Sequence, residues 1–193
     1  MAPQILRADS RTPAPWKNGG GVTSQVAVHP EGAGADDFMW RVSVAEVAHS
    51  GPFSAFEGVD RIITVVDGPG MALTVDGVPH MVDAPYEPFA FPGDAATECE
   101  LLGGPITDFN VMVRRSRATA QVRIERSPAS VRASAGTRVL VVVLKGWAVL
   151  HQAFVPLGPF DAVLFSSGDS ASFSVEGVVA VVTLDERPGL PGR

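Results

Sequence analysis

Two apolar runs decide how this sequence folds: residues 62–66 read IITVV and residues 139–144 read VLVVVL. Both runs consist of residues that favour β-strands, and both carry apolar side chains at odd and even positions. A strand that is apolar on both faces is buried on both faces, as when one sheet packs against another. The two runs therefore predict an all-β protein in which sheets cover one another.

Further short β-rich runs extend outward from these two, each closed by Gly, Pro, Asp or Asn. The 20 glycines and 16 prolines among 193 residues argue against a helical bundle, because both residue types interrupt helices. We expect a β-sandwich or barrel with few short helices, the best candidate for a helix being residues 115–122. Strands are predicted at 22–29, 39–47, 61–66, 71–75, 89–91, 98–102, 109–113, 138–144, 147–150, 162–165, 171–175 and 178–184.

The two halves of the sequence repeat one order of features. The first run ends in Asp67-Gly68, and a Gly93-Asp94 pair follows; the second ends in Lys145-Gly146, and Gly168-Asp169 follows. The spacing from the turn glycine to the aspartate of the pair is 26 residues in the first half and 23 in the second. This order is typical of small jelly-roll barrels and predicts an internal duplication, with chance similarity between hairpins as the alternative.

Charge is distributed unevenly, which suggests where one barrel ends. Residues 114–138 contain seven arginines and one acid, so this stretch has a net charge of +6. The whole chain has a net charge of −6, so the remainder carries −12. The stretch has no aromatic side chain on which a base could stack, so we expect no nucleic-acid partner. The predicted organisation is an N-terminal barrel over residues 1–115, an arginine-rich connector over 116–137 and a C-terminal barrel over 138–193.

Composition narrows the class of protein. An apolar share of 46% with 19% charged residues excludes a disordered chain, and no apolar run approaches the ~20 residues that span a bilayer. The first fifteen residues carry charges where a signal peptide would be apolar, and a single cysteine, Cys99, excludes an internal disulfide. We therefore expect a soluble cytoplasmic protein with no membrane partner.

Four blocks carry a resemblance to a known family: residues 16–23 (WKNGGGVT), 40–47 (WRVSVAEV), 51–61 (GPFSAFEGVDR) and 108–115 (DFNVMVRR). In order and spacing they resemble the HutD/Ves family, bicupin proteins of the cupin superfamily. The resemblance implies a bicupin fold of two jelly-roll-like β-barrels, bacterial origin and an association with histidine utilisation. It also implies regulation of pathway flux by binding urocanate or a formylated glutamate derivative.

Many cupins hold a metal, but this sequence lacks the ligands for one. A cupin metal site needs a His-x-His pair, which places two imidazoles on one strand face, with a carboxylate and a third histidine. The strand at 40–47 instead places Arg41, Ser43 and Ala45 on one face. We expect neither metal nor cofactor, because no two of the four histidines lie within four residues of each other: His29, His49, His80 and His151.

The polar residues of the predicted strands suit an anion instead. Arg41 and Ser43 share a strand face, Arg61 begins another strand, and Asp108 and Asn110 share a face of a third. A guanidinium holds a carboxylate through two parallel hydrogen bonds, and Ser and Asn can orient the rest of a small ligand. The alternative is structural, with either arginine in a buried ion pair to Asp108 or Asp60 that fixes strand register.

A glycine-rich loop precedes the first long strand. Asn18 and the three glycines after it suit a hairpin turn, and they could also let backbone amides approach a ligand carboxylate, with Lys17 adding charge. No serine elbow or activated cysteine is present, so no catalytic residue is assigned. The predicted ligand-binding set is Lys17, Asn18, Arg41, Ser43, Arg61, Asp108 and Asn110.

The sequence thus predicts a metal-free protein that binds a small carboxylate metabolite. One alternative is a metal-free isomerase, deformylase or other hydrolase that acts on such a metabolite with Asp108 as base. Another is an assembly module whose cavity has no ligand. We expect the C-terminal barrel, with Phe160, Phe165 and Phe173, to give packing support and a surface for a homodimer.

Overall fold

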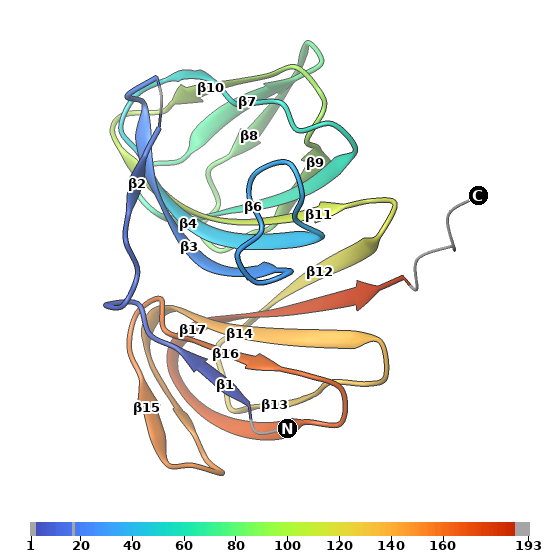
Figure 1. The fold of residues 1–193 in the computed structure, drawn as a ribbon. Coiled ribbons are helices and arrows are strands. Elements are labelled where there is room, and N and C mark those ends of the chain that lie inside the picture. The colour runs from blue at the N-terminus through green and yellow to red at the C-terminus, as the bar shows by residue number, and fades with distance from the viewer. Residues whose placement is uncertain (1–2, 17, 188–193) are drawn as a thin grey trace, which may run out of the picture. The chain divides into compact units, whose positions relative to one another are not determined.

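The computed structural model describes residues 3–16 and 18–187, which fold into strands joined by turns, with no helix in that part of the chain (Figure 1). Because it has no helix, the described part also lacks any helix that could cross a membrane. The all-β prediction is confirmed, and the short helix expected at 115–122 is wrong. The strands are β1 (Gln4–Leu6), β2 (Ala14–Pro15), β3 (Gly21–His29), β4 (Trp40–Val47), β5 (Gly51–Pro52), β6 (Val59–Asp67), β7 (Met71–Val75), β8 (Val78–Val82), β9 (Phe89–Pro92), β10 (Thr97–Leu101), β11 (Ile106–Arg114), β12 (Ala118–Glu125), β13 (Ala129–Arg132), β14 (Thr137–Leu150), β15 (Val155–Leu157), β16 (Ala162–Phe165) and β17 (Ser170–Glu186).

The chain divides into two compact units. The first comprises Arg11–Arg115, and the second combines the residues up to Ser10 with those from Ser116 onward. The predicted division differs at two places. Strand β1 lies near the N-terminus but pairs with β16, and the stretch predicted as a connector at 116–137 contains β12 and β13, which both pair with β17.

The connector was mispredicted because its arginines alternate with small and apolar residues. In β12 the side chains of Ala118, Ala120, Val122 and Ile124 point to one face, while the arginines lie on the other face or beyond the strand. Charge density alone suggested a solvated linker. The same residues also alternate between apolar or small and polar side chains, the pattern that an edge strand needs.

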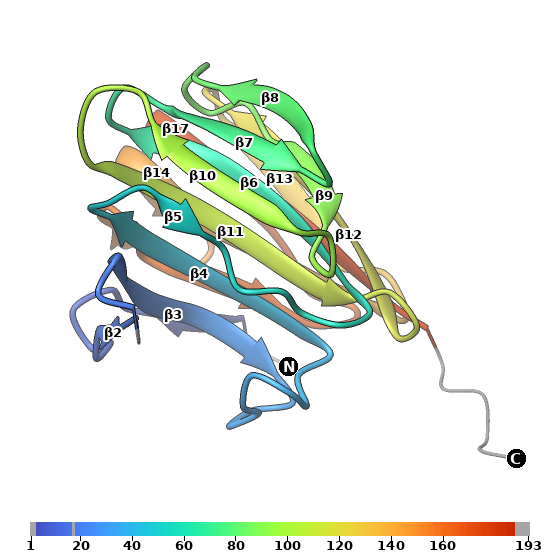
Figure 2. The same cartoon turned by 90° about the horizontal axis from the view of Figure 1, so that it is seen from above.

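The first unit is a sandwich of two antiparallel sheets. A six-stranded sheet has the order β2-β3-β4-β11-β6-β9, and a four-stranded sheet has the order β5-β10-β7-β8 (Figures 1 and 2). Their facing side chains form one apolar core that includes Ile63, Val65, Leu73, Cys99 and Ile106. Ile63 and Val65 of the 62–66 run belong to this core, and Thr64 and Val66 are buried as well.

The second unit is built from one seven-stranded sheet that bends around its own core. Its two longest strands, β14 and β17, pair along most of their length, and both halves of each supply core residues. At the bend, Gly146 lies opposite Gly177, and both have positive φ angles of 75° and 132°. A Cβ atom on either glycine would lie 2.1 Å from a carbonyl oxygen of the opposite strand, so neither position has room for a side chain. The sequence predicted a turn at Gly146 and four separate strands, whereas the chain continues through a bulge.

Candidate functional site

A cavity of about 460 Å³ opens in the first unit, between the six-stranded sheet and the loop that follows β5. Its floor is formed by side chains of the central strands: Arg41, Ser43, Arg61, Asn110 and Met112. Its outer wall comes from the loops and is more exposed, and includes Trp16, Asn18, Phe53, Ser54 and Phe56. Five of the seven predicted ligand-binding residues therefore line one cavity.

Strand register brings the polar floor residues together. Strand β11 lies between β4 and β6, so Met112 pairs with Arg41 on one side and with Arg61 on the other. Asn110 lies two residues before Met112 on β11, on the same face of the sheet, and pairs with Ser43. Neighbouring strands lie about 4.8 Å apart, which places the two arginine backbones roughly 10 Å from each other across Met112.

Arg61 is the most deeply buried cation of the site. The residue is 7% exposed, and its Nε atom has no hydrogen-bond partner. Three rings surround the guanidinium carbon, whose distances to the ring centroids are 5.0 Å for Phe91, 5.1 Å for Phe53 and 5.9 Å for Phe56. Aromatic faces attract a cation but accept none of its N–H groups in the way a carboxylate does. The guanidinium therefore keeps hydrogen-bonding capacity for a ligand.

The protonation of Arg61 reflects this environment. Burial lowers its pKa to about 10, Asp108 opposes that effect, and the neighbouring charge of Arg41 adds to it. The group still remains a cation at neutral pH. A buried cation without a paired acid is costly, and an anionic guest in the cavity would reduce that cost.

Two further polar groups of the cavity lack internal partners. Arg41 is half-buried, and burial lowers its pKa. Its buried Nε has no hydrogen-bond partner, nor does the Oδ1 of Asn110, a residue that is 8% exposed. Native proteins pair the large majority of buried polar atoms, so this concentration of unpaired atoms around one cavity is typical of a binding site.

Asp108 lies on the same sheet face as Asn110, two residues before it on β11, but it is buried between the sheets and does not line the cavity. The residue is 2% exposed, and its Oδ1 atom has no hydrogen-bond partner. Burial raises the pKa of its carboxyl to about 7, although the charge of Arg61 acts in the opposite direction. The predicted alternative, an ion pair from Arg41 or Arg61 to Asp108 or Asp60, is absent among the described residues. Asp60 instead accepts a hydrogen bond from Arg115.

The glycine-rich loop is a hairpin turn at the rim of the cavity. Gly19 donates its N–H to the carbonyl of Trp16, and Gly20 donates to Oδ1 of Asn18, so neither amide is left for a ligand. At Gly21 a Cβ atom would lie 3.2 Å from the Trp16 ring and 2.5 Å from a carbonyl oxygen. This glycine therefore allows Trp16 to pack over the strand. Lys17 lies outside the described residues.

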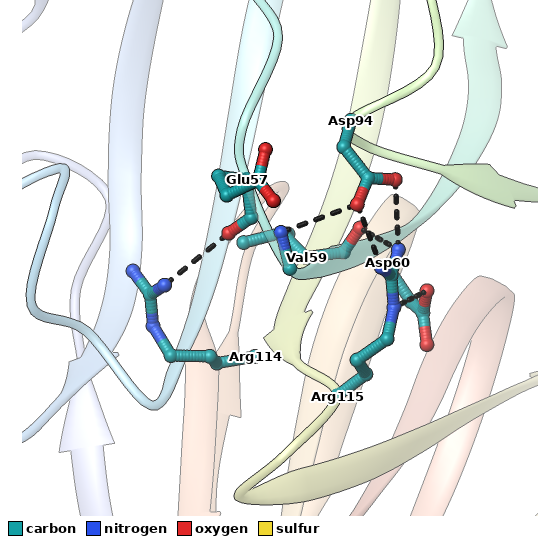
Figure 3. Close-up of polar contacts among 7 residues, drawn as sticks. Glu57, Val59, Asp60, Asp94, Arg114 and Arg115 are labelled. Carbon is teal, nitrogen blue, oxygen red and sulfur yellow. Dashed lines mark hydrogen bonds and ion pairs between the residues drawn. The ribbon is translucent and has the colours of Figure 1, made fainter.

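Arg115 and Asp94 hold residues 58–60, the segment between Phe56 and Arg61, through hydrogen bonds (Figure 3). The guanidinium of Arg115 donates to both Asp94 oxygens at 2.7 and 2.9 Å, to Asp60 at 2.9 Å and to the Val59 carbonyl at 2.9 Å. Hydrogen bonds from Arg115 lower the pKa of Asp94 to about 2. Asp94 also accepts the N–H of Gly58.

The neighbouring arginine and glycine complete this arrangement. Arg114 donates to the carbonyls of Asp36, Phe38 and Glu57, so it stabilises the loops around the end of its strand. Gly93 leaves space for the Arg61 stem, because a Cβ there would lie 3.1 Å from Arg61 Cγ. The Gly-Asp pair was recognisable in the sequence as a jelly-roll feature. Its role next to the arginine, and those of Phe56, Phe91 and Met112, were not.

None of the histidines in the described part of the chain lines the cavity. His49 lines a neighbouring hollow of about 250 Å³, which shares Trp16, Asn18, Pro52 and Phe53 with the cavity. Within residues 3–16 and 18–187 no group of three or more His, Cys, Asp or Glu side chains could hold a metal ion. The residues of the cavity also do not fit one, because two guanidinium groups would repel a cation.

Sequence comparison relates this chain to a known family and to several of its members. The family described as HutD matches residues 8–183. An uncharacterised 21.2 kDa protein from the hutC 3′ region of Pseudomonas putida is 43% identical over 192 residues, covering 95% of this chain and 98% of that one. The Ves protein of Cronobacter sakazakii is 35% identical over 144 residues, covering 73% and 76%.

Solved structures agree with these sequence matches. HutD from Pseudomonas fluorescens SBW25, determined in a formate condition, superposes with a TM-score of 0.84 at 35% identity and covers 97% of this chain and 100% of its own. A bacterial pirin from Escherichia coli in complex with nickel(II) has a TM-score of 0.65 at 12% identity, covering 98% and 100%, which shows a shared fold alone. The predicted bicupin architecture is thereby confirmed.

Proposed function

Because this chain belongs to the HutD family, we propose that it is a cytoplasmic regulatory protein that binds a small carboxylate metabolite in the cavity of its first unit. Arg61 is the principal contact, through its free N–H groups. Arg41, Ser43 and Asn110 orient the remainder of the ligand from the same face of the sheet. Asn18 closes the rim.

The observation that carries this proposal is the state of Arg61, a buried guanidinium surrounded by three aromatic rings with no acid hydrogen-bonded to it. Arginine presents N–H groups in a planar fork that matches a carboxylate. The rings hold the fork in place, so less side-chain entropy is lost when a ligand binds. A structural ion pair would instead leave the arginine saturated.

The size and surroundings of the cavity favour a small planar or short-chain acid. About 460 Å³ lies in the range of pockets that enclose small metabolites. Urocanate and N-formylglutamate both carry a carboxylate and a second polar end, and the family resemblance together with the hutC location of one relative makes them the first ligands to test. The Pseudomonas fluorescens HutD was determined in a formate condition, and formate is the smallest carboxylate.

Binding rather than turnover is the activity that the geometry favours. Asp108, the candidate base, is buried between the sheets and is not among the residues that line the cavity. A general base must come within hydrogen-bond reach of the proton it removes. The polar side chains that do line the cavity can donate hydrogen bonds, and the two charged ones, Arg41 and Arg61, are cations, which suits recognition of an anion.

Calorimetry and thermal shift with urocanate and N-formylglutamate test the proposal. We expect one ligand to bind and to raise the melting temperature, and Arg61→Met to weaken binding by roughly tenfold or more while the protein stays folded, since Met suits the aromatic surroundings. Arg132→Met, an exposed arginine on β13, is the matched control and should leave binding unchanged. Absence of binding by both metabolites, or unchanged affinity in Arg61→Met, contradicts the proposal. Product formation would indicate an enzyme.

A further inference from the structure

Asp108 is a buried carboxyl group that the proposed binding function does not use directly. It lies on β11, on the face that also carries Asn110 and Met112, and its register partners are Ala45 on β4 and Val65 on β6. Both partners are apolar, and Oδ1 of Asp108 has no hydrogen-bond partner. An ionised carboxylate in such a place is supported almost entirely by nearby charge.

Few charged or titratable groups face Asp108 from the strands packed around it. Arg61 on β6 acts on it electrostatically, and Cys99 reaches it from β10 in the opposite sheet. Arg41 on β4 acts on Arg61. Burial raises the pKa of the Cys99 thiol to about 11, so it stays neutral over the physiological range. Arg61 is therefore the group that stabilises the charged form of Asp108.

The same guanidinium is the proposed anchor for the ligand. A carboxylate that binds Arg61 from the cavity adds a second negative charge near this cation and offsets its field at Asp108. Asp108 then loses the interaction that favours its ionised form, while its burial is unchanged. Two anions around one guanidinium compete, as in any pair of like charges that share one site.

We propose that carboxylate binding in the cavity is coupled to the uptake of a proton by Asp108. This inference rests on the proposed binding function and adds a determinant of affinity to it. With Asp108 ionised, the cluster of Arg41, Arg61 and Asp108 carries one net positive charge; with Asp108 protonated it carries two. The protonated form is the better host for an anion, and for a dianion above all.

Linkage fixes the direction of the pH dependence. A ligand that raises the pKa of Asp108 binds more tightly to the protonated protein, so its affinity falls as the pH rises between the pKa of the free protein and that of the complex. The pKa of Asp108 is about 7 in the protein without ligand. Each pKa unit that the ligand adds corresponds to a tenfold difference in Kd between the acidic and alkaline limits.

Calorimetry on the unaltered protein measures this coupling directly. The probe is N-formylglutamate, because its carboxylates stay ionised between about pH 6 and 9, whereas the imidazole of urocanate titrates near that range. Titrations in bis-Tris, imidazole and Tris, buffers that supply no competing organic anion, give the number of protons exchanged from the dependence of heat on buffer ionisation. We expect an uptake of up to one proton per site near pH 7.5, falling toward zero near pH 5.5, with Kd weakening at least threefold from about pH 6 to 9.

Variants assign the proton to a residue. Asp108→Asn should abolish the uptake and leave Kd independent of pH, and Asp108→Leu serves if the amide is not tolerated at this site. Asp67→Asn, which removes an exposed acid on the opposite face of the same sheet, should keep the uptake. Binding without proton uptake, or uptake that persists in both Asp108 variants, overturns the inference and leaves the proposed function standing. No binding of either N-formylglutamate or urocanate at any pH rejects the proposed function itself.

Discussion

The guanidinium carbon of Arg61 lies 5.0 Å from the centroid of the Phe91 ring, on the strand next to it in the sheet. The two residues are register partners across β6 and β9, so the contact follows from strand pairing. An aromatic face holds the cation without occupying its N–H groups. This relationship separates an arginine that is ready to bind a ligand from one that is consumed by a structural ion pair.

Replacing Phe91 by Leu should therefore weaken ligand binding as well as packing. The substitution removes one of the three rings around Arg61, and we expect Kd to rise roughly three- to tenfold. The lost packing should also lower the free energy of unfolding by about 1–3 kcal/mol. Calorimetry and chemical denaturation measure the two effects. Phe165→Leu, in the core of the second unit, should reduce stability by a similar amount and leave Kd unchanged.

Gly93→Ala should displace the anchor arginine. A Cβ atom at residue 93 would lie 2.9 Å from the Val59 carbonyl oxygen and 3.1 Å from Arg61 Cγ, so the side chain or strand must move. We expect weaker binding and a melting temperature lower by roughly 3–8 °C. Gly158→Ala is the control, because its Cβ would meet no atom within 4 Å. Unchanged affinity in Gly93→Ala would mean that the position of Arg61 does not limit binding.

Asp108→Asn should stabilise the protein at alkaline pH and have little effect at acidic pH. Burial raises the pKa of Asp108 to about 7 from 3.8, so the folded state holds a proton that the unfolded state has lost. Its contribution is fully present below about pH 4 and is lost as the pH rises through about 7, a change of up to about 4 kcal/mol. Melting temperatures of the unaltered protein and of Asp108→Asn, measured from about pH 5 to about pH 9, check this prediction. A variant that is equally destabilised at every pH would contradict the predicted gain in stability at alkaline pH.

Arg115→Met should make the first unit more sensitive to acid. Hydrogen bonds from Arg115 lower the pKa of Asp94 to about 2, below its usual 3.8. The stabilisation is present above about pH 4 and is lost as the pH falls toward about 2. Arg115→Met should therefore melt at a lower temperature than the unaltered protein at neutral pH, and the two melting temperatures should approach each other in acid. Thermal unfolding followed across this range provides the measurement. Arg117→Met, at an exposed position two residues away, should behave like the unaltered protein.

Much of the fold could be predicted because strand formation has a local signature. Alternation and double-sided apolar runs located most strands of both units, and the parity of residues 41 and 43 and of 108 and 110 correctly placed each pair on one strand face. The bend at Gly146 and Gly177 was misread as a turn, since a glycine permits both and only the partner strand distinguishes them. The arginines at 114–138 concealed two strands for a different reason, because their charge density suggested a solvated linker although the alternation of an edge strand was present.

Sequence alone determined an all-β chain with two cupin-like halves and the alternation that aligns its polar residues, because side-chain direction in a strand depends only on position along the chain. Which strands become neighbours depends on pairing between segments far apart in the sequence. Only that pairing decided that Arg61 would lie among Phe53, Phe56 and Phe91 without a hydrogen-bonded acid. It also decided that Asp108 would be buried between the sheets. The chemistry of the site follows from distances and burial, which the tertiary structure sets.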